Sequence, residues 1–424
     1  MTEATNSVTN PATNSPTNSA TNTVTNTAAN KASTKALSVI FAAIGLDAVG
    51  IGLIFPILPR LLEEVTHGDN VAPYIGIMTA LYAVMQFIFA PVLGALSDRL
   101  GRRPVLLISL AGAAINYLVM AFAPQLWMLL LGRAIAGLTS ANMSVAMAYI
   151  TDISPEDQRA RRFGLFNAVF GAGFIIGPIL GGVLGDYGLR LPFIAAAILN
   201  AANLLMAYFV LPESRTPSRE KLDLAALNPL LPMRWIFAMK NLVPVTVVFF
   251  ILSMTGEVYG TCWALWGNDV FRWNGLWIGL SLGTYGLCQA LAQAFLPGPA
   301  VKLLGERGTI LTGFAGTCLA LVVMAFAKQG WMVFAVMPVF VMGGVGIPAL
   351  QSLASRMVDE SRQGQFQGVL ASAVSLASII GPLMFSTLYF VVRSQWPGAI
   401  WLTVVVVYAI AVPLVLSLRF RSAA

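Results

Sequence analysis

The sequence has little charge for its length. Asp, Glu, Lys and Arg together make up 10% of the 424 residues, whereas 57% of the residues are hydrophobic. A soluble protein of this size needs far more polar surface to cover its core. The apolar residues instead form successive runs of about twenty, the length at which a helix crosses a bilayer core of about 30 Å. We therefore predict an integral membrane protein.

Cysteine and histidine are also scarce, which argues against metal and disulfide chemistry. Cys262, Cys288 and Cys318 lie singly in apolar segments, without the spacing of a disulfide framework or a zinc site. We interpret them as packing residues and predict no metal site. His67, the single histidine, precedes the second apolar run and is poorly placed for proton transfer within the membrane.

Twelve apolar segments follow one another along the chain. We expect spanning helices at residues 36–59, 73–96, 104–123, 126–150, 163–185, 191–211, 242–266, 275–297, 308–327, 330–352, 366–391 and 396–418. An even number of spans places both termini on the same side of the membrane. The predicted fold class is an all-α integral membrane protein.

Polar stretches divide these spans into two sets of six. Residues 1–35 repeat Thr and Asn, offer almost nothing to bury, and are predicted to form a disordered tail. The N-terminal half covers 36–211, a central loop covers 212–241, the C-terminal half covers 242–418, and a short terminus covers 419–424.

The basic residues predict the orientation. The segments on the side of the termini carry 19 Lys and Arg residues, the opposite side carries 5, and Arg133 lies inside a span. By the positive-inside rule both termini and the central loop are cytoplasmic. The net charge of +7 is thus spread over short loops, a pattern that does not indicate a nucleic-acid partner.

The two halves share a repeated pattern at a constant spacing. Five positions recur 204 residues later: Gly94 as Gly298, Gly101 as Gly305, Gly164 as Gly368, Gly177 as Gly381, and Pro178 as Pro382. Five matches at one spacing indicate two duplicated six-helix halves. In transporters built this way, the substrate site lies between the halves near the middle of the membrane.

Three charged residues lie clearly within predicted spans: Asp47, Arg133 and Glu257. Each costs about 2.5–3.5 kcal/mol at the bilayer centre on insertion scales, so such residues are usually functional. Asp47 is a candidate proton carrier, and Arg133 is a fixed positive charge. The alternatives are a structural salt bridge or a side chain that snorkels to a membrane interface, and they apply most to Arg133, which lies near the start of its span. For Glu257 the alternative is a side chain that reaches toward the external surface.

Uncharged polar residues within the spans are candidates for lining a substrate cavity. These are Gln86, Asn116, Asn142 and Gln289. Hydrogen bonds between neighbouring helices are an equally good explanation for them. Trp263 and Trp266 fit the aromatic belt at the membrane surface better than they fit drug stacking.

Several stretches resemble one transporter family. "GALSDRLGRRPVLL" looks like the signature loop of the major facilitator superfamily, and "FGAGFIIGPILGG", with Gly173, Gly177 and Pro178, is similar to the motif of its drug/proton antiporters. "LDAVGIGLIFPILP", "GRAIAGLTSANMSVAMAYITDI" and "GIPALQSLASRMVDESRQGQFQG" resemble the bacterial tetracycline/proton antiporters. The likeness extends over everything after residue 35.

The resemblance implies a conformational latch at the signature loop. It places Asp98 at the positive N-terminal end of a later helix, near Gln365 and Phe366, when the cytoplasmic side closes. The cluster that would form this latch comprises Gly94, Asp98, Gly101, Arg102 and Arg103. An ordinary positive-inside loop explains the arginines, but neither the acidic residue nor the repeated glycines.

The sequence also departs from the tetracycline pattern. Where that family has an acidic residue, a histidine and a second acidic residue, this chain has Asn116, Gln289 and Thr317. Where the family commonly has an uncharged amide, this chain has Glu257. These departures put both the proton-coupling set and the natural substrate in question.

These observations predict a transporter of the bacterial inner membrane rather than an enzyme. We expect a monomeric antiporter that exports tetracycline-like drugs in exchange for protons, with Asp47, Arg133 and Glu257 coupling proton movement to transport and with no cofactor. The alternatives are a multidrug antiporter for other amphiphilic antimicrobials and a proton symporter that imports a metabolite. A membrane sensor or scaffold would not need the three buried charges.

Overall fold

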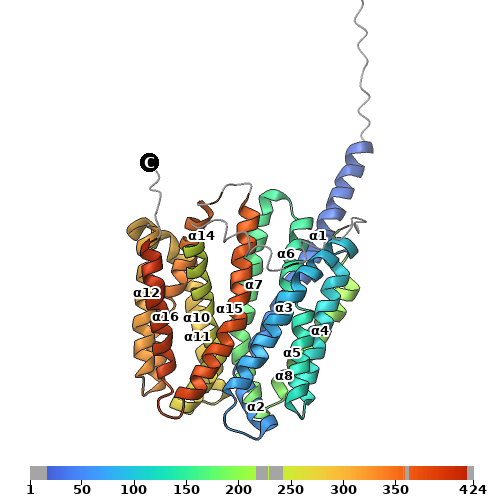
Figure 1. Cartoon of the computed structure of the whole chain (residues 1–424). Helices are drawn as coiled ribbons and strands as arrows, with labels where there is room; N and C mark the ends of the chain where they lie inside the picture. The colour runs from blue at the N-terminus through green and yellow to red at the C-terminus, as the bar shows by residue number, and fades with distance from the viewer. Residues whose placement is uncertain (1–16, 216–227, 229–241, 357, 359–361, 418–424) are drawn as a thin grey trace, which may run out of the picture.

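The computed structural model describes residues 17–215, 228, 242–356, 358 and 362–417. Throughout these residues the secondary structure is helical, without strands. The helices stand side by side as two groups (Figure 1). The predicted all-α membrane fold is confirmed.

Fifteen helices make up the described chain. They are α1 (Thr17–Ile54), α2 (Leu58–Thr66), α3 (Ala72–Leu100), α4 (Arg102–Phe122), α5 (Leu126–Leu138), α6 (Asn142–Ile153), α7 (Glu156–Tyr187), α8 (Leu191–Val210), α10 (Val243–Phe271), α11 (Gly275–Phe295), α12 (Pro297–Ala325), α13 (Gly330–Phe340), α14 (Met342–Arg356), α15 (Gln363–Val392) and α16 (Ala399–Ser417). Helix α1 begins and α16 ends at one face, called here the termini face, and α2 lies at the opposite face (Figure 1).

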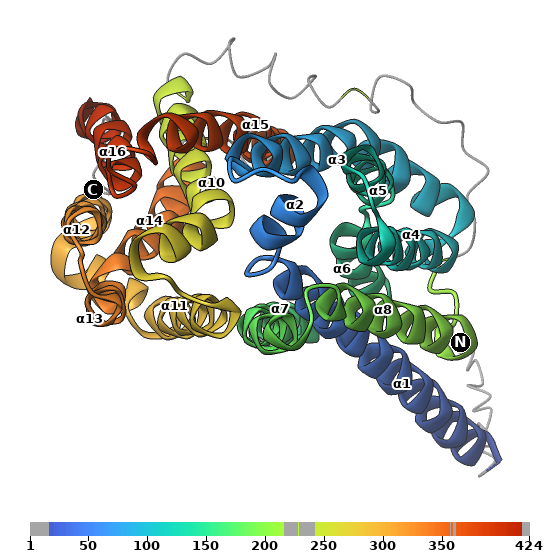
Figure 2. The same cartoon turned by 90° about the horizontal axis from the view of Figure 1, so that it is seen from below.

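Eleven segments of the described chain are long and apolar enough to cross a membrane. They correspond to eleven of the twelve predicted spans. The remaining prediction, 275–297, falls on α11, a helix of 21 residues whose glycine, serine, threonine and glutamine residues make it less apolar. In Figure 2 it stands beside α7 and α13 as part of the bundle.

Two of the predicted spans are broken in the middle. Residues 139–141 separate α5 from α6, and Val341 separates α13 from α14. At the first break the Thr139 hydroxyl donates a hydrogen bond to the Ile135 carbonyl oxygen at 2.8 Å, a local bond that competes with the helix ladder. Irregular backbone at membrane depth is tolerated where it lines a cavity.

The duplicated pattern has the same backbone conformation in both halves. Gly101 and Gly305, 204 residues apart, are the two described glycines with a φ in the left-handed region, at 106° and 69°. Gly101 separates α3 from α4, and Gly305 lies at a kink within α12. The repeat therefore reflects a shared turn that glycine adopts without steric cost.

The structure describes part of the Thr/Asn-rich tail, and its disorder stays a prediction. Helix α1 includes residues 17–34 of the Thr/Asn-rich segment, and this part projects beyond the bundle (Figure 1). Residues 1–16, most of the central loop and residues 418–424 lie outside the described chain.

The two halves pack closely near the opposite face. The main contacts between them pair α7 with α11 and α3 with α15, as Figure 2 shows from that side. A Cβ atom on Gly182 would lie 2.1 Å from the Gly275 carbonyl oxygen, and one on Gly279 would lie 2.2 Å from the Pro178 carbonyl oxygen. Glycine at these positions is what allows the helix backbones to touch.

Charged groups reinforce this closure. The Asp186 carboxylate of α7 accepts hydrogen bonds from the backbone N–H groups of Gly275 and Leu276, at 3.1 Å each, at the start of α11. Arg393, after α15, donates to the Asp69 carbonyl oxygen in the other half and pairs with Asp269 at 2.9 Å. The structure is therefore closed at the opposite face.

Candidate functional site

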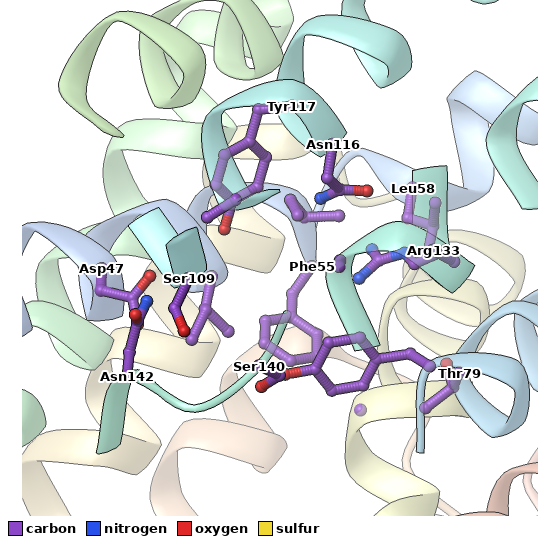
Figure 3. A pocket seen from close by; sticks show the side chains of 16 residues that line it. Asp47, Phe55, Leu58, Thr79, Ser109, Asn116, Tyr117, Arg133, Ser140 and Asn142 are labelled. Atoms are coloured by element: carbon purple, nitrogen blue, oxygen red, sulfur yellow. The ribbon is translucent and has the colours of Figure 1, made fainter. Parts of the chain in front are cut away.

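A cavity of about 200 Å³, called here the polar cavity, is lined mainly by the N-terminal half, with Gly260 of α10 at its edge. Figure 3 shows side chains from α1, α3, α4, α5 and α6 converging on it. Its polar lining consists of Asp47, Thr79, Tyr82, Ser109, Asn116, Tyr117, Arg133, Ser140 and Asn142. The structure thus brings together two of the three predicted buried charges and two of the four predicted polar residues.

Asp47 and Arg133 do not pair with one another. They enter the polar cavity from different sides (Figure 3), and no ion pair joins them among the salt bridges of the described chain. Asp47 is 7% exposed, and the Asn142 amide lies against its carboxylate. The Nε atom of Arg133 is buried without a hydrogen-bond partner among described residues. The alternative of a structural salt bridge at Arg133 is therefore not seen within the described residues.

The break between α5 and α6 supplies a polar group that the sequence analysis missed. The Ser140 hydroxyl hydrogen-bonds with the Tyr82 hydroxyl at 2.7 Å and accepts from the Gln86 amide at 3.0 Å. The run of small polar residues around Ser140 in "GLTSANM" was the available signal. No such signal marked Tyr82 and Tyr117 in the sequence, because an aromatic residue in a span usually packs against lipid or against the protein core.

Asn116 lies in the polar cavity, and Gln289 does not. The Oδ1 atom of Asn116 is buried without a partner in the described chain, and the residue is 3% exposed. Gln289 is directed at Gly344 of α14, where a Cβ atom would lie 2.2 Å from its Nε2 atom. Thr317 donates to the Phe340 carbonyl oxygen at 3.0 Å. The last two residues thus occupy helix contacts within the C-terminal half.

A wider cavity of about 700 Å³, called here the vestibule, leads to Asp47. It is lined by Gln86, Pro91 and Phe170 from the N-terminal half and by Ala371 and Ser375 of α15 from the C-terminal half. These residues lie between Asp47 and the termini face, since α3 ends and α15 begins at that face. The site is therefore accessible from the termini face and closed at the opposite face.

The third buried charge lies in a separate cavity of about 300 Å³ between the halves, called here the aromatic cavity. The Ser378 hydroxyl of α15 donates to the Glu257 carboxylate at 2.5 Å. The lining consists of Phe55, Thr79, Phe174, Pro178, Gly256, Glu257, Tyr259, Gly260, Leu282 and Tyr285. Glu257 therefore faces the interface between the halves, and the alternative that it reaches the external surface is not supported.

Trp263 and Trp266 do not form an interfacial belt, so that prediction is wrong. Trp263 is 2% exposed and its Nε1–H donates to Ser281 at 2.8 Å, while Trp266 is fully buried. Both pack against Trp401, with ring centroids 5.7 and 5.0 Å apart. The sequence pattern was misleading because α10 packs against α15, α16, α3 and α14.

The predicted latch residues form a charge network at the termini face. Asp98 pairs with Arg102 and with Arg215, at 2.8 Å in each case, and Arg102 also contacts Asp152 at 3.0 Å. The Glu213 carboxylate accepts hydrogen bonds from the backbone N–H groups of Arg102 and Arg103 at the start of α4, at 2.7 and 3.2 Å. Since this face is open here, the expected contact of Asp98 with the start of α15 stays a prediction.

The glycines of the latch and of the antiporter motif have different surroundings. No atom lies within 4 Å of a Cβ built on Gly94, whereas a Cβ on Gly101 would lie 2.4 Å from the Glu213 carboxylate. Gly173 and Gly177 allow α7 to touch α1, since a Cβ on either would lie 2.6–2.7 Å from a backbone oxygen of α1. Pro178 bends the same stretch and forms part of the aromatic cavity.

Comparison with known proteins gives a consistent result. The family model of the Major Facilitator Superfamily matches residues 40–284 and 245–424. The chain is 48% identical over 377 residues to the class C tetracycline resistance protein of Escherichia coli, covering 89% of this chain and 95% of the relative. It is 45% identical to the class G protein of Vibrio anguillarum, covering 88% and 94%.

Solved structures show the same fold at low identity. The nucleoside transporter NupG is 12% identical with a TM-score of 0.77, and the human organic anion transporter MFSD10 is 23% identical with a TM-score of 0.65. Each match covers 90% of this chain and 99% of the other. The chain therefore belongs to the Major Facilitator Superfamily and, within it, to the family of the tetracycline resistance proteins.

Proposed function

We propose that this protein is a proton-coupled antiporter that exports tetracycline-like drugs across the bacterial inner membrane by alternating access. The termini face is cytoplasmic, as the excess of basic residues on that side indicates. The structure is then inward-facing, with the vestibule open to the cytoplasm and the opposite face closed. The proton gradient supplies the energy, and a single chain holds the whole site, so a monomer suffices.

The observation that carries the proposal is the pair of uncompensated charges in the polar cavity. An ionised carboxylate at membrane depth is costly unless it meets a proton, a cation or a hydrogen-bonding ligand. The Asn142 amide lies beside Asp47, and neither Asp47 nor Arg133 forms an ion pair within the described part of the chain. A polar drug and a proton relieve the same cost at Asp47, so binding of one disfavours binding of the other. That competition is the physical basis of antiport.

The cycle follows from this competition. Drug enters through the vestibule and binds between Asp47 and Arg133, and the contacts at the opposite face then open. A proton arriving from outside neutralises Asp47 and displaces the drug. The Asp98 cluster closes the cytoplasmic side while the external side is open.

The test is uphill transport of tetracycline into inverted vesicles on an imposed pH gradient. Asp47→Asn keeps the side-chain volume but removes the titrating group, so we expect proton-driven uptake to be lost. Asp47→Glu keeps a carboxylate at that depth and should retain a substantial part of the proton-driven uptake. Asp157→Asn makes the same chemical change at an exposed position in the first turn of α7 and serves as the control. Uptake by Asp47→Asn at the parent rate would refute the coupling role.

A further inference from the structure

The aromatic cavity joins a buried carboxylate to aromatic rings from both halves of the protein. We propose that it is a subsite for an organic cation, which binds the positively charged group of an amphiphilic substrate at Glu257. The proposal rests on the transport function proposed above and specifies a class of substrate for it.

The Glu257 carboxylate lacks a cationic partner within the described chain. The Ser378 hydroxyl is the hydrogen-bond donor recorded for it there, and no described Lys or Arg forms an ion pair with it. A glutamine would fill nearly the same volume and would accept the same hydrogen bond at a lower cost of burial. The attraction between the carboxylate and a positive charge that enters the cavity offsets this cost of burial.

The walls of the aromatic cavity suit an organic cation. Phe55 and Phe174 meet edge to face with centroids 5.6 Å apart, and Tyr285 adds a third ring to the lining. Tyr259 stacks on Tyr285 and on Trp401, so it supports this wall from behind. The faces of aromatic rings attract quaternary and protonated amines, which are weakly hydrated. Small metal ions require several oxygen ligands, whereas this lining offers a single carboxylate.

Glycines provide the room for a ligand at Glu257. A Cβ atom on Gly381 would lie 2.9 Å from Cβ and 3.1 Å from Cγ of Glu257, so only glycine leaves that side chain its place beside α15. Gly256 and Gly260 flank Glu257 on the cavity side of α10 and add no side chains to the lining.

The aromatic cavity and the polar cavity adjoin one another. Both are lined by Phe55, Thr79 and Gly260. One substrate can therefore place a cationic group at Glu257 and its polar groups between Asp47 and Arg133. The expected substrate is a flat or aromatic molecule that carries a positive charge at one end.

The experiment measures binding of tetraphenylphosphonium to the purified full-length protein, with tetraphenylborate as an anion of the same shape. We expect Glu257→Gln to weaken tetraphenylphosphonium binding by about tenfold or more, because it removes the charge but keeps the volume. Glu257→Asp should retain most of the affinity, and tetraphenylborate should bind no more weakly to Glu257→Gln than to the parent. Glu156→Gln, at an exposed cytoplasmic position, makes the same change as a control.

Each outcome decides the proposal. Failure of the parent to bind tetraphenylphosphonium, or equal binding by the parent and Glu257→Gln, overturns it. The proposed function is tested separately by tetracycline transport in the Asp47 variants. If the parent exports tetracycline but Glu257→Gln binds the cation as tightly as the parent does, the subsite alone is refuted. If cation binding depends on Glu257 but the parent does not export tetracycline, the tetracycline function alone is refuted.

Discussion

Asp186 should set how readily the external side opens. Its carboxylate crosses from the N-terminal half to the first two N–H groups of α11 in the C-terminal half, and it also pairs with Arg60 at 3.2 Å. Opening the external side must break the contacts with α11. Removing the negative charge should therefore favour the outward-open state.

The structure sets the size of this effect. A carboxylate at a helix N-terminus contributes about 0.3–1 kcal/mol when exposed and up to about 2 kcal/mol when partly buried. The Asp186 side chain is 28% exposed, so a value of about 1–2 kcal/mol is appropriate. Asp186→Asn keeps one acceptor oxygen but loses the charge, and the ratio of outward-open to inward-open protein should rise about 5- to 30-fold.

Labelling with a membrane-impermeant maleimide measures that ratio. Leu58 lines the polar cavity toward the external side and is 7% exposed in this state, so Leu58→Cys reports external opening. Ser375→Cys reports opening of the vestibule at the termini face. The three native cysteines are replaced by serine, and Asp157→Asn provides the charge-matched control.

We expect Asp186→Asn to increase labelling at position 58 and to decrease it at position 375. Unchanged labelling at both positions, in protein of parent stability, would show that the contact with α11 does not hold the external side closed.

Three further predictions follow from other contacts. Gly101→Ala should lower the free energy of unfolding by about 1–3 kcal/mol, because almost only glycine adopts this backbone conformation. Gly94→Ala should not lower it, because Gly94 is helical and has open space around it. Equal melting temperatures of the two variants would contradict this prediction. Partial desolvation raises the pKa of the Glu63 carboxyl above its ordinary value in the externally closed state, although the Arg393 charge opposes the shift. The closed state therefore binds the proton more tightly and should lose population as pH rises from the ordinary pKa to the raised one. Glu63→Gln should flatten the pH dependence of labelling at position 58, and an unaltered profile would exclude Glu63. Asp98→Asn should preserve folding but reduce the rate of drug export, because the latch then lacks its negative charge. Export at the parent rate, with unchanged labelling at position 375, would remove the latch from the mechanism.

The order of the helices and the duplicated halves could be predicted from the sequence. The bilayer imposes a length and an apolar composition on each span, and these are local properties of the chain. The repeat at 204 residues located Gly101 and Gly305 at equivalent positions, and the structure gives both a φ that glycine adopts without strain. Asp47, Arg133 and Glu257 stood out for a related reason, because a charged residue within an apolar span is visible in the sequence and is costly to place at that depth.

The grouping of these residues into cavities required the tertiary structure. Packing between segments far apart in the chain decides which face of a helix contacts another helix. The sequence of a long apolar run indicates little about that face. Hence Trp263 and Trp266 turned out to be buried in the C-terminal half, and Gln289 turned out to lie against Gly344. Only the folded structure places Glu257 among aromatic rings, apart from Asp47 and Arg133, since helices from both halves form that cavity.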